Sequence, residues 1–275
     1  MNCKNCDHAL EDDDLFCENC GAKVIKERIT TKFLLRELLA SLGWDSLYWR
    51  TLKKMFTKPQ EVLTEYVGGT RKKYINPFSH LLIGTALFLA VINIFKKDFD
   101  NILYAINKEQ VELSKKDLTK IKGTISDAEF KDLTRRKETA VMVLKYNDFM
   151  LKYFNIIVLL FIPLFAFISK LTYKKPYNYG EHIVMNAYLY GTSMYFSITV
   201  LILAVLIHPK IYYSTTFIFM IYYLLVFSKI YKHSFGKAIL KLLRFLLLFL
   251  LTMLVFMLLL GIIIAIVMIA TKVLT

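Results

Sequence analysis

Five long runs of apolar residues alternate with polar segments along the chain. A helix rises about 1.5 Å per residue, so about 20 mostly apolar residues are needed to cross about 30 Å of hydrocarbon. Each run reaches about that length, and their approximate bounds are residues 77–95, 153–171, 186–208, 211–231 and 242–270. The pattern therefore predicts a mainly α-helical, polytopic membrane protein with about five transmembrane helices.

The connections predict how these spans follow one another. Only His208, Pro209 and Lys210 separate the third and fourth runs. Proline lacks an amide hydrogen and ends the helix before it, so we expect a tight hairpin there. The fifth run exceeds the minimum length and should tilt or extend beyond the bilayer. Residues 77–275 would thus form one five-span membrane domain.

Within that domain, the segment 96–152 alternates charged residues with sparse apolar positions. Ser126 and Glu129 have the spacing of a capping box, in which each side chain bonds the other residue's backbone at a helix start. We expect a solvated helical hairpin on the outer side of the membrane rather than a catalytic domain.

The segment 26–76, ahead of the first span, should form basic juxtamembrane helices. Asp45 is a suitable N-cap for a helix over 46–56, Pro59 suits a first helical position, and Gly68-Gly69 suits a helix end. Apolar and cationic residues intermix in 47–56, and such a helix can lie in the bilayer interface. Its apolar residues could instead pack on the amino-terminal segment or on the cytoplasmic ends of the spans. The sequence leaves both interpretations open.

Four residues directly before the first span, Arg71, Lys72, Lys73 and Tyr74, are typical of a membrane edge. Cations there contact anionic lipid headgroups, and tyrosine is favoured at that depth. We expect them to anchor the first span and set its direction.

Composition narrows the class of protein. Hydrophobic residues make up 56% of the chain and the formal net charge is +14, which excludes a secreted disulfide scaffold, a disordered tail protein and an ordinary soluble enzyme. Residues 170–185 and 229–244 together hold eight Lys and Arg, whereas the short connections on the other side hold two, Lys210 and Lys272. Since positive charge is retained inside, we expect the amino terminus in the cytoplasm and the carboxyl terminus outside.

All four cysteines lie within the first 20 residues, as Cys3-x-x-Cys6 and Cys17-x-x-Cys20. Two such pairs can place four thiolates around one ion at tetrahedral geometry, which predicts a structural zinc ribbon over residues 1–25. A disulfide does not fit the reducing cytoplasm, and no βαβ pattern supports a redox motif. Gly21 suits the sharp turn after the second pair, and Phe16 suits the apolar plug that a small metal domain needs.

The ribbon's charge bears on its partner. Residues 1–20 contain Lys4 against six acids, so phosphate would be repelled and nucleic acid is not the expected ligand. A cytoplasmic protein partner is one interpretation, and an acidic run that merely solvates the loop is the other.

Glu181 and His182 lie at the start of the third span. His182, Asn186, Tyr190, Ser193 and Ser197 follow one another at steps of four, four, three and four, so they share one polar face of the helix. They could line a hydrated path, with Glu181 and His182 exchanging protons at its cytoplasmic mouth. Ordinary packing between helices is favoured, because no carboxylate lies deep in the spans. The Glu-His pair could also bond the basic segment. No catalytic motif such as GxSxG, HExxH or a Walker loop is present.

Three stretches carry a family resemblance: the ribbon end over 16–23, the stretch 58–78 with its core EYVGGTRKKYINPF, and Tyr179-Gly-Glu-His-Ile183. The chain resembles an uncharacterised bacterial family of integral membrane proteins with an amino-terminal zinc ribbon. Gly69-Thr70-Arg71 stands where the family pattern has Gly-Lys-Arg. The resemblance implies architecture and a bacterial source, hence the inner membrane, and implies no activity.

We therefore expect a zinc-ribbon-bearing membrane scaffold that recruits or senses a cytoplasmic partner, with a homo-oligomer as an open option. The alternative is a transporter or channel for a small solute or lipid that uses the polar face of the third span. A membrane enzyme with Glu181 and His182 as acid and base is the less favoured third class.

Overall fold

The computed structural model describes residues 1–24, 30–35, 46–121 and 123–274. It divides the chain into two compact units, Met1–Leu42 and Gly43–Thr275, which are described separately. The expected N-cap Asp45 and part of the basic segment lie outside the described residues. In the described part of the chain the regular structure is helical, apart from two isolated β-bridges in the first unit.

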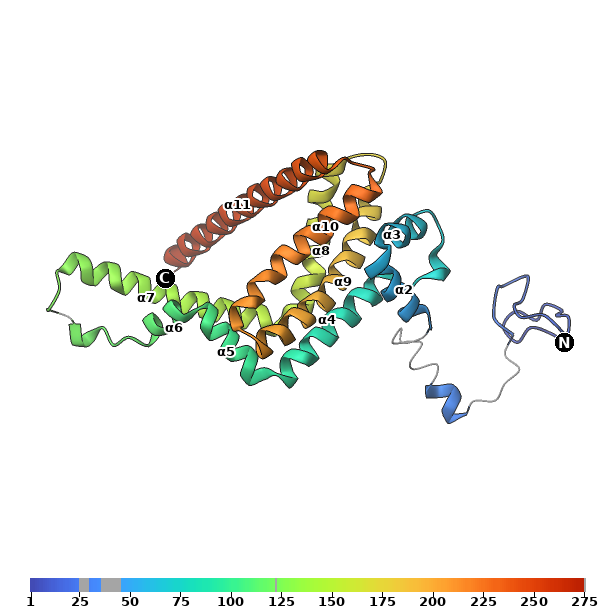
Figure 1. Cartoon of the computed structure of the whole chain (residues 1–275), viewed down its shortest axis with the longest axis horizontal. Helices are drawn as coiled ribbons and strands as arrows, with labels where there is room; N and C mark the ends of the chain where they lie inside the picture. Colours follow the sequence, from blue (N-terminus) through green and yellow to red (C-terminus); the bar gives the residue numbers. More distant parts are fainter. Residues whose placement is uncertain (25–29, 36–45, 122, 275) are drawn as a thin grey trace. The chain divides into compact units, whose positions relative to one another are not determined.

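The second unit consists of α-helices joined by short connections (Figure 1). In chain order these are α2 (Ser46–Thr57), α3 (Pro59–Val67), α4 (Pro77–Ile94), α5 (Lys96–Ile106), α6 (Lys108–Lys115), α7 (Asp127–Lys152), α8 (Phe154–Tyr173), α9 (Tyr179–Leu206), α10 (Ser214–Ile230) and α11 (Phe235–Leu274). Short 3₁₀ turns occur at η1 (Arg71–Lys73), η2 (Thr119–Ile121) and η3 (Pro209–Tyr213).

Five helices in the described residues are long and apolar enough to cross a membrane, which fits a multi-pass membrane protein. Three follow the predicted runs closely, with η3 forming the predicted hairpin at Pro209, whereas α9 and α11 each begin seven residues before their predicted starts. The third begins seven residues before the predicted 186, because Asn178 and Glu181 cap each other's backbone and start α9 at Tyr179. A helix is longer than its apolar run wherever such polar caps lie beyond the run.

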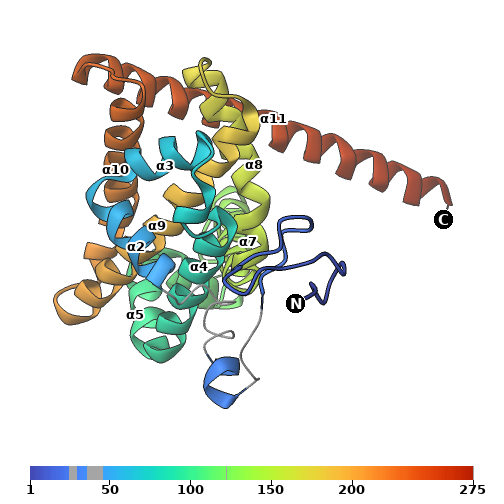
Figure 2. The ribbon, with the colours of Figure 1, turned by 90° about the vertical axis from the view of Figure 1, so that its right-hand side faces the viewer.

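Helix α9 lies at the centre of the unit, and α4, α8 and α10 pack around it in both views (Figures 1 and 2). It approaches α4 most closely where glycines replace side chains: a Cβ at Gly84 would lie 2.6 Å from the carbonyl oxygen of Gly191. Nearby, the buried His80 ring bonds Thr192 Oγ1 through Nε2 at 3.0 Å. Small residues let these two helices touch through their backbones.

The α2–α3 segment packs on the spans, as the second of the two open interpretations predicted. The Tyr48 and Tyr195 hydroxyls lie 2.5 Å apart, and Tyr222 Oη donates to the Met55 carbonyl at 2.8 Å. Val62 and Leu63 are fully buried in the same core. Protein therefore covers part of the apolar surface of α2 and α3, while Trp49 and Phe56 remain 57% and 44% exposed.

The chain between α3 and α4 is tied down on both sides of one residue. The amide of Ile75 donates to Thr51 Oγ1 at 3.0 Å, and its carbonyl accepts from the Tyr188 hydroxyl. Both partners are buried and come from elements on either side, α2 and α9. This residue sets where α4 begins relative to α9.

Segment 96–152 forms α5, α6 and α7, and α6 packs along α7. The predicted capping box is present: Glu129 N donates to Ser126 Oγ at 3.3 Å, and Ser126 N donates to Glu129 Oε2 at 3.1 Å. It starts α7, which runs to Lys152 directly before α8.

Candidate metal centre and polar cluster

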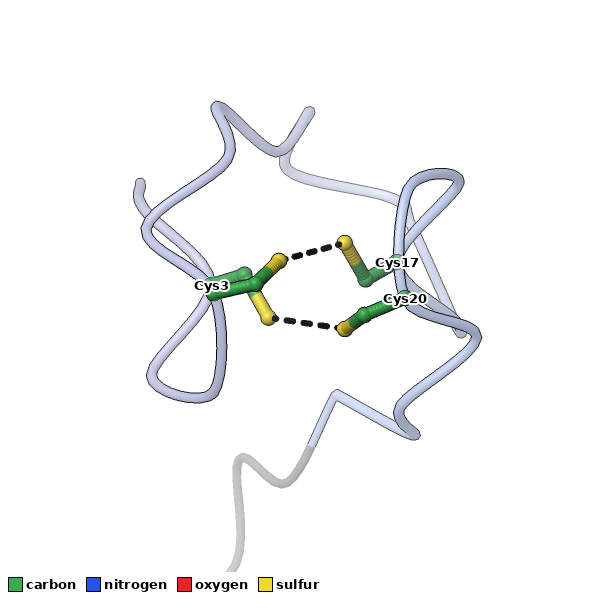
Figure 3. A group of neighbouring side chains, drawn as sticks. Cys3, Cys17 and Cys20 are labelled. Atoms are coloured by element: carbon green, nitrogen blue, oxygen red, sulfur yellow. Dashed lines mark hydrogen bonds between the residues drawn. The ribbon is translucent and has the colours of Figure 1, made fainter.

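The first unit brings the four thiols together from two loops (Figure 3). Cys3 Sγ lies 3.7 Å from Cys20 Sγ, Cys6 Sγ lies 3.6 Å from Cys17 Sγ, and all four sulfurs are within 4.8 Å of one another. A tetrahedral ion with metal–sulfur bonds of about 2.3 Å requires sulfurs about 3.8 Å apart. The donor set and its spacing therefore fit one tetrahedral metal ion.

The two loops repeat the same backbone turn. Asp7 N donates to the Cys3 carbonyl and Gly21 N to the Cys17 carbonyl, each at 2.8 Å. The donor residue has positive φ in both, +58° at Asp7 and +69° at Gly21. Glycine at the second turn was expected, whereas Asp7 was not recognised, although aspartate is among the side chains that tolerate this conformation.

The expected apolar plug is wrong. Phe16 is 54% exposed, and the side chain buried against Cys3 and Cys17 is Leu10. Phe16 lies in an extended bridge with Lys23 directly before the buried Cys17. Side chains alternate between faces in extended backbone, so burying Cys17 turns Phe16 outward.

A second cluster of polar side chains lies buried between α8, α9 and the end of α10. The His182 ring bonds Ser169 Oγ through Nδ1 at 2.8 Å and the Tyr231 hydroxyl through Nε2 at 3.2 Å. Asn186 Nδ2 donates to Ser169 Oγ at 3.0 Å and to the His182 carbonyl at 2.7 Å. His182, Ser169 and Asn186 are all buried, so the cluster joins three helices by internal hydrogen bonds.

Glu181 and His182 do not form the proposed pair. Glu181 Oε2 accepts from the Asn178 amide at 2.5 Å as a helix cap, while His182 points to α8 and α10. Adjacent residues on a helix do not face each other. Neither side chain bonds the basic segment in the described residues.

The rest of the predicted polar face is also occupied by the chain itself. Ser193 Oγ donates to the Tyr190 carbonyl at 2.7 Å and Ser197 Oγ to the Ser193 carbonyl at 3.0 Å. The Tyr190 ring packs edge-on to Phe219 with centroids 5.8 Å apart. The residues that complete the cluster, Ser169 and Tyr231, were missed because they lie on other helices and share no spacing with α9.

Replacing Ser169 by alanine should lower the free energy of unfolding by about 1–3 kcal/mol, because it leaves a buried His182 nitrogen without its partner. The matched control is Ser197→Ala, which removes only a bond within α9 and should have little effect. Denaturant unfolding of the purified protein in detergent micelles measures both. Equal losses in the two variants would contradict the role given to Ser169.

The four residues of the predicted membrane anchor lie in two different environments. Tyr74 is buried, and its hydroxyl donates to Glu65 Oε2 at 2.7 Å, beside Lys73 Nζ at 2.5 Å from the same oxygen. Lys54 Nζ donates to the Tyr74 hydroxyl at 3.0 Å. This network links α2, α3 and η1, whereas Arg71 and Lys72 remain exposed.

The network holds the Glu65 carboxylate ionised. Hydrogen bonds from Lys73 and then Tyr74 lower the pKa of Glu65 from about 4.5 to about 2. The pKa of Lys54 is raised, first by its bond to Tyr74 and then by Glu61. A depressed carboxyl pKa stabilises the fold above the unfolded value, and that stabilisation is lost as pH falls through the folded value.

Wild-type protein should therefore lose stability between pH about 4.5 and about 2 through this residue, and Glu65→Gln should lose that part of the pH dependence. The unfolding midpoint in detergent, measured across this pH range, checks the prediction. Glu112→Gln is the control, since its carboxylate lies 3.8 Å from Lys108 and is 59% exposed. Parallel pH profiles for wild type and Glu65→Gln would show that the network contributes nothing.

Residues 45–89 match the family described as "Protein of unknown function (DUF3667)". The matched segment covers α2, α3, η1 and most of α4, and it includes the Glu65 network, Ile75 and Gly84. It also includes all of 58–78, one of the three stretches on which the resemblance to an uncharacterised family rests, and the match fits that resemblance. No curated protein and no solved structure matches the chain.

Proposed function

We propose that this protein is a membrane-anchored scaffold whose zinc ribbon recruits or senses a cytoplasmic protein partner. The observation that carries the proposal is the cluster of four thiols within 4.8 Å of one another. Four thiolates complete the coordination of a tetrahedral zinc ion and leave no position for a substrate or water. Such a site is structural, and it supports a small module that serves binding rather than catalysis.

The surface of the module supports a protein ligand. Leu15 and Phe16 are 73% and 54% exposed, whereas Leu10 is buried against the thiols. Acidic residues flank them on both sides, at Glu11, Asp13, Asp14 and Glu18. Apolar side chains ringed by acids favour a partner with apolar and cationic groups, and they disfavour nucleic acid.

The membrane unit supports the anchoring role. The excess of Lys and Arg in the connections 170–185 and 229–244 supports a cytoplasmic amino terminus in a bacterial inner membrane, with the carboxyl terminus outside. Arg71 and Lys72 are exposed directly before α4, where they would contact anionic lipid headgroups. The hydrogen bonds within the His182 cluster support a packing role for the third span rather than a transport path.

The test compares full-length wild type with Cys17→Ser and Phe16→Asp, each cross-linked in cells and purified from membranes. Phe16→Asp should keep its zinc, because Phe16 is exposed and supplies no ligand, but should lose a partner that depends on this surface. A protein recovered with wild type should fall at least about tenfold with both variants. Unchanged recovery with metal-free Cys17→Ser would overturn the proposal.

A further inference from the structure

An exposed apolar stripe runs along α7 and into α8. Its members are large side chains that the described part of the chain leaves exposed: Met142 (70% exposed), Tyr146 (58%), Phe149 (53%), Tyr153 (38%), Ile156 (58%) and Leu160 (70%). The first four precede the apolar span that starts at Phe154. Lipid tails would cover the last two, whereas the first four require another cover.

The spacing of these residues is that of a coiled-coil seam. Successive members are separated by four, three, four, three and four positions, which places them at alternating d and a positions of a heptad. The sequence itself repeats with the same period, because residues 143–148 read VLKYND and residues 150–155 read MLKYFN. Besides these a and d residues, Leu159 is 38% exposed at a g position. A stripe concentrated at a and d is narrower than the face a helix buries in a core or a bilayer, and it is typical of helix pairing.

The opposite face of α7 and α8 packs against other helices of the same chain. Leu151 and Phe154 pack into the apolar clusters of the bundle, and Val158 is buried there. The hydrogen-bond ladder continues across the junction, since Tyr153 N donates to the Phe149 carbonyl at 3.1 Å and Ile157 N to the Tyr153 carbonyl at 2.9 Å. Among the residues that the structure describes, the stripe is thus a second face without a partner.

We propose that this stripe is a dimer seam between two copies of the chain, with the α7–α8 segments parallel and in register. A partner must follow the stripe from outside the membrane into it, and a second copy presents the same heptads at the same depth. Two copies in one membrane share their direction, so a twofold axis along the membrane normal brings each a and d residue against its counterpart.

The area and the charges fit this pairing. At about 200 Å² per large side chain, the exposed fractions correspond to about 700 Å² per copy and about 1,400 Å² in the dimer, within the range of stable interfaces. Lys145 and Lys152 fall at g positions. In a parallel pair they face the e positions, Val143, Met150 and Ile157, so no like charges oppose each other across the seam.

Photo-cross-linking of the full-length protein in its membrane tests the seam without added cysteines. Benzoylphenylalanine replaces Phe149 at a d position or, as the matched control, the adjacent Asp148 at an outer position. The seam predicts a cross-linked species of twice the chain mass from position 149 and at least about fivefold less from position 148. Equal yields at both positions, or cross-links to lipid alone from position 149, would overturn it and place the stripe against the bilayer surface.

Dissociation on dilution in lipid nanodiscs or liposomes provides a second measurement. Phe149→Glu places two carboxylates opposite each other and should weaken dimerisation at least about tenfold. Tyr104→Glu is the matched control, an exposed aromatic residue of α5 outside the seam, and it should leave the dimer unchanged. A wild-type protein that remains monomeric at all lipid-to-protein ratios would also overturn the proposal.

Discussion

A Cys17→Ser variant is expected to lose the proposed zinc ion and the fold of residues 1–24 while its spans remain inserted. A unit of this size buries little more than Leu10 besides the thiols, so the proposed zinc would supply its folding free energy, on the order of 10 kcal/mol for a structural zinc. A hydroxyl cannot replace a thiolate as a zinc ligand at neutral pH. The ion should fall from about one per chain to none.

Elemental analysis of the purified protein measures the metal, and hydrogen exchange reports the fold. The amides of Asp7 and Gly21, which bond carbonyls of the two loops, should be protected in wild type and should exchange freely in Cys17→Ser. Glu18→Ser is the matched control, since Glu18 lies between two ligands and supplies none. One zinc per chain in Cys17→Ser would contradict the site, and iron in place of zinc would contradict the metal assigned to it.

Replacing Gly191 by alanine is expected to lower the free energy of unfolding of the second unit by about 2–3 kcal/mol. The added Cβ would lie 2.9 Å from Leu81 Cα and 2.8 Å from His80 Cδ2, so α4 must move away from α9. Two of the three nearest atoms belong to the Leu81 backbone, which cannot rotate aside as a side chain can. Separation would also strain the His80–Thr192 bond and the bonds that hold Ile75.

Unfolding in detergent micelles measures this loss, and two further glycines calibrate it. Gly84→Ala should cost a similar amount, because its Cβ would lie 2.6 Å from the Gly191 carbonyl oxygen. Gly236→Ala should be neutral, since a Cβ there meets nothing within 4 Å. If Gly191→Ala were as stable as Gly236→Ala, the close contact between α4 and α9 would be disproved.

Much of the helical architecture can be predicted from the local pattern of apolar residues, because the lipid environment allows few backbone conformations. Hydrocarbon cannot bond exposed backbone, so each long apolar run must become a helix, and all five runs do. The capping box at Ser126 and Glu129 could also be predicted from the sequence, since both partners lie within one helical turn. The start of α9 was misplaced only because its cap, Asn178 with Glu181, lies outside the apolar run.

The candidate sites also differ in how far local sequence predicts them. The cysteine spacing predicts a four-thiol cluster because each pair is bound into one short loop, and the sulfurs do lie together. The polar face of α9 could be listed from helical spacing, but its partners Ser169 and Tyr231 could not. The sequence pattern also could not decide which apolar side chain is buried against the thiols, since Leu10 and Phe16 are both apolar and differ only in the direction they point.

The sequence by itself thus determined the elements: five membrane-compatible helices, a metal-binding pattern and the helix start at Ser126. These depend on residues within a few turns of one another or on burial in lipid. Only the tertiary structure decided that α2 and α3 pack on the spans, that the His182 cluster is internally bonded, and that the heptad stripe is left exposed. Those outcomes depend on contacts between residues distant in the chain, which no local pattern encodes.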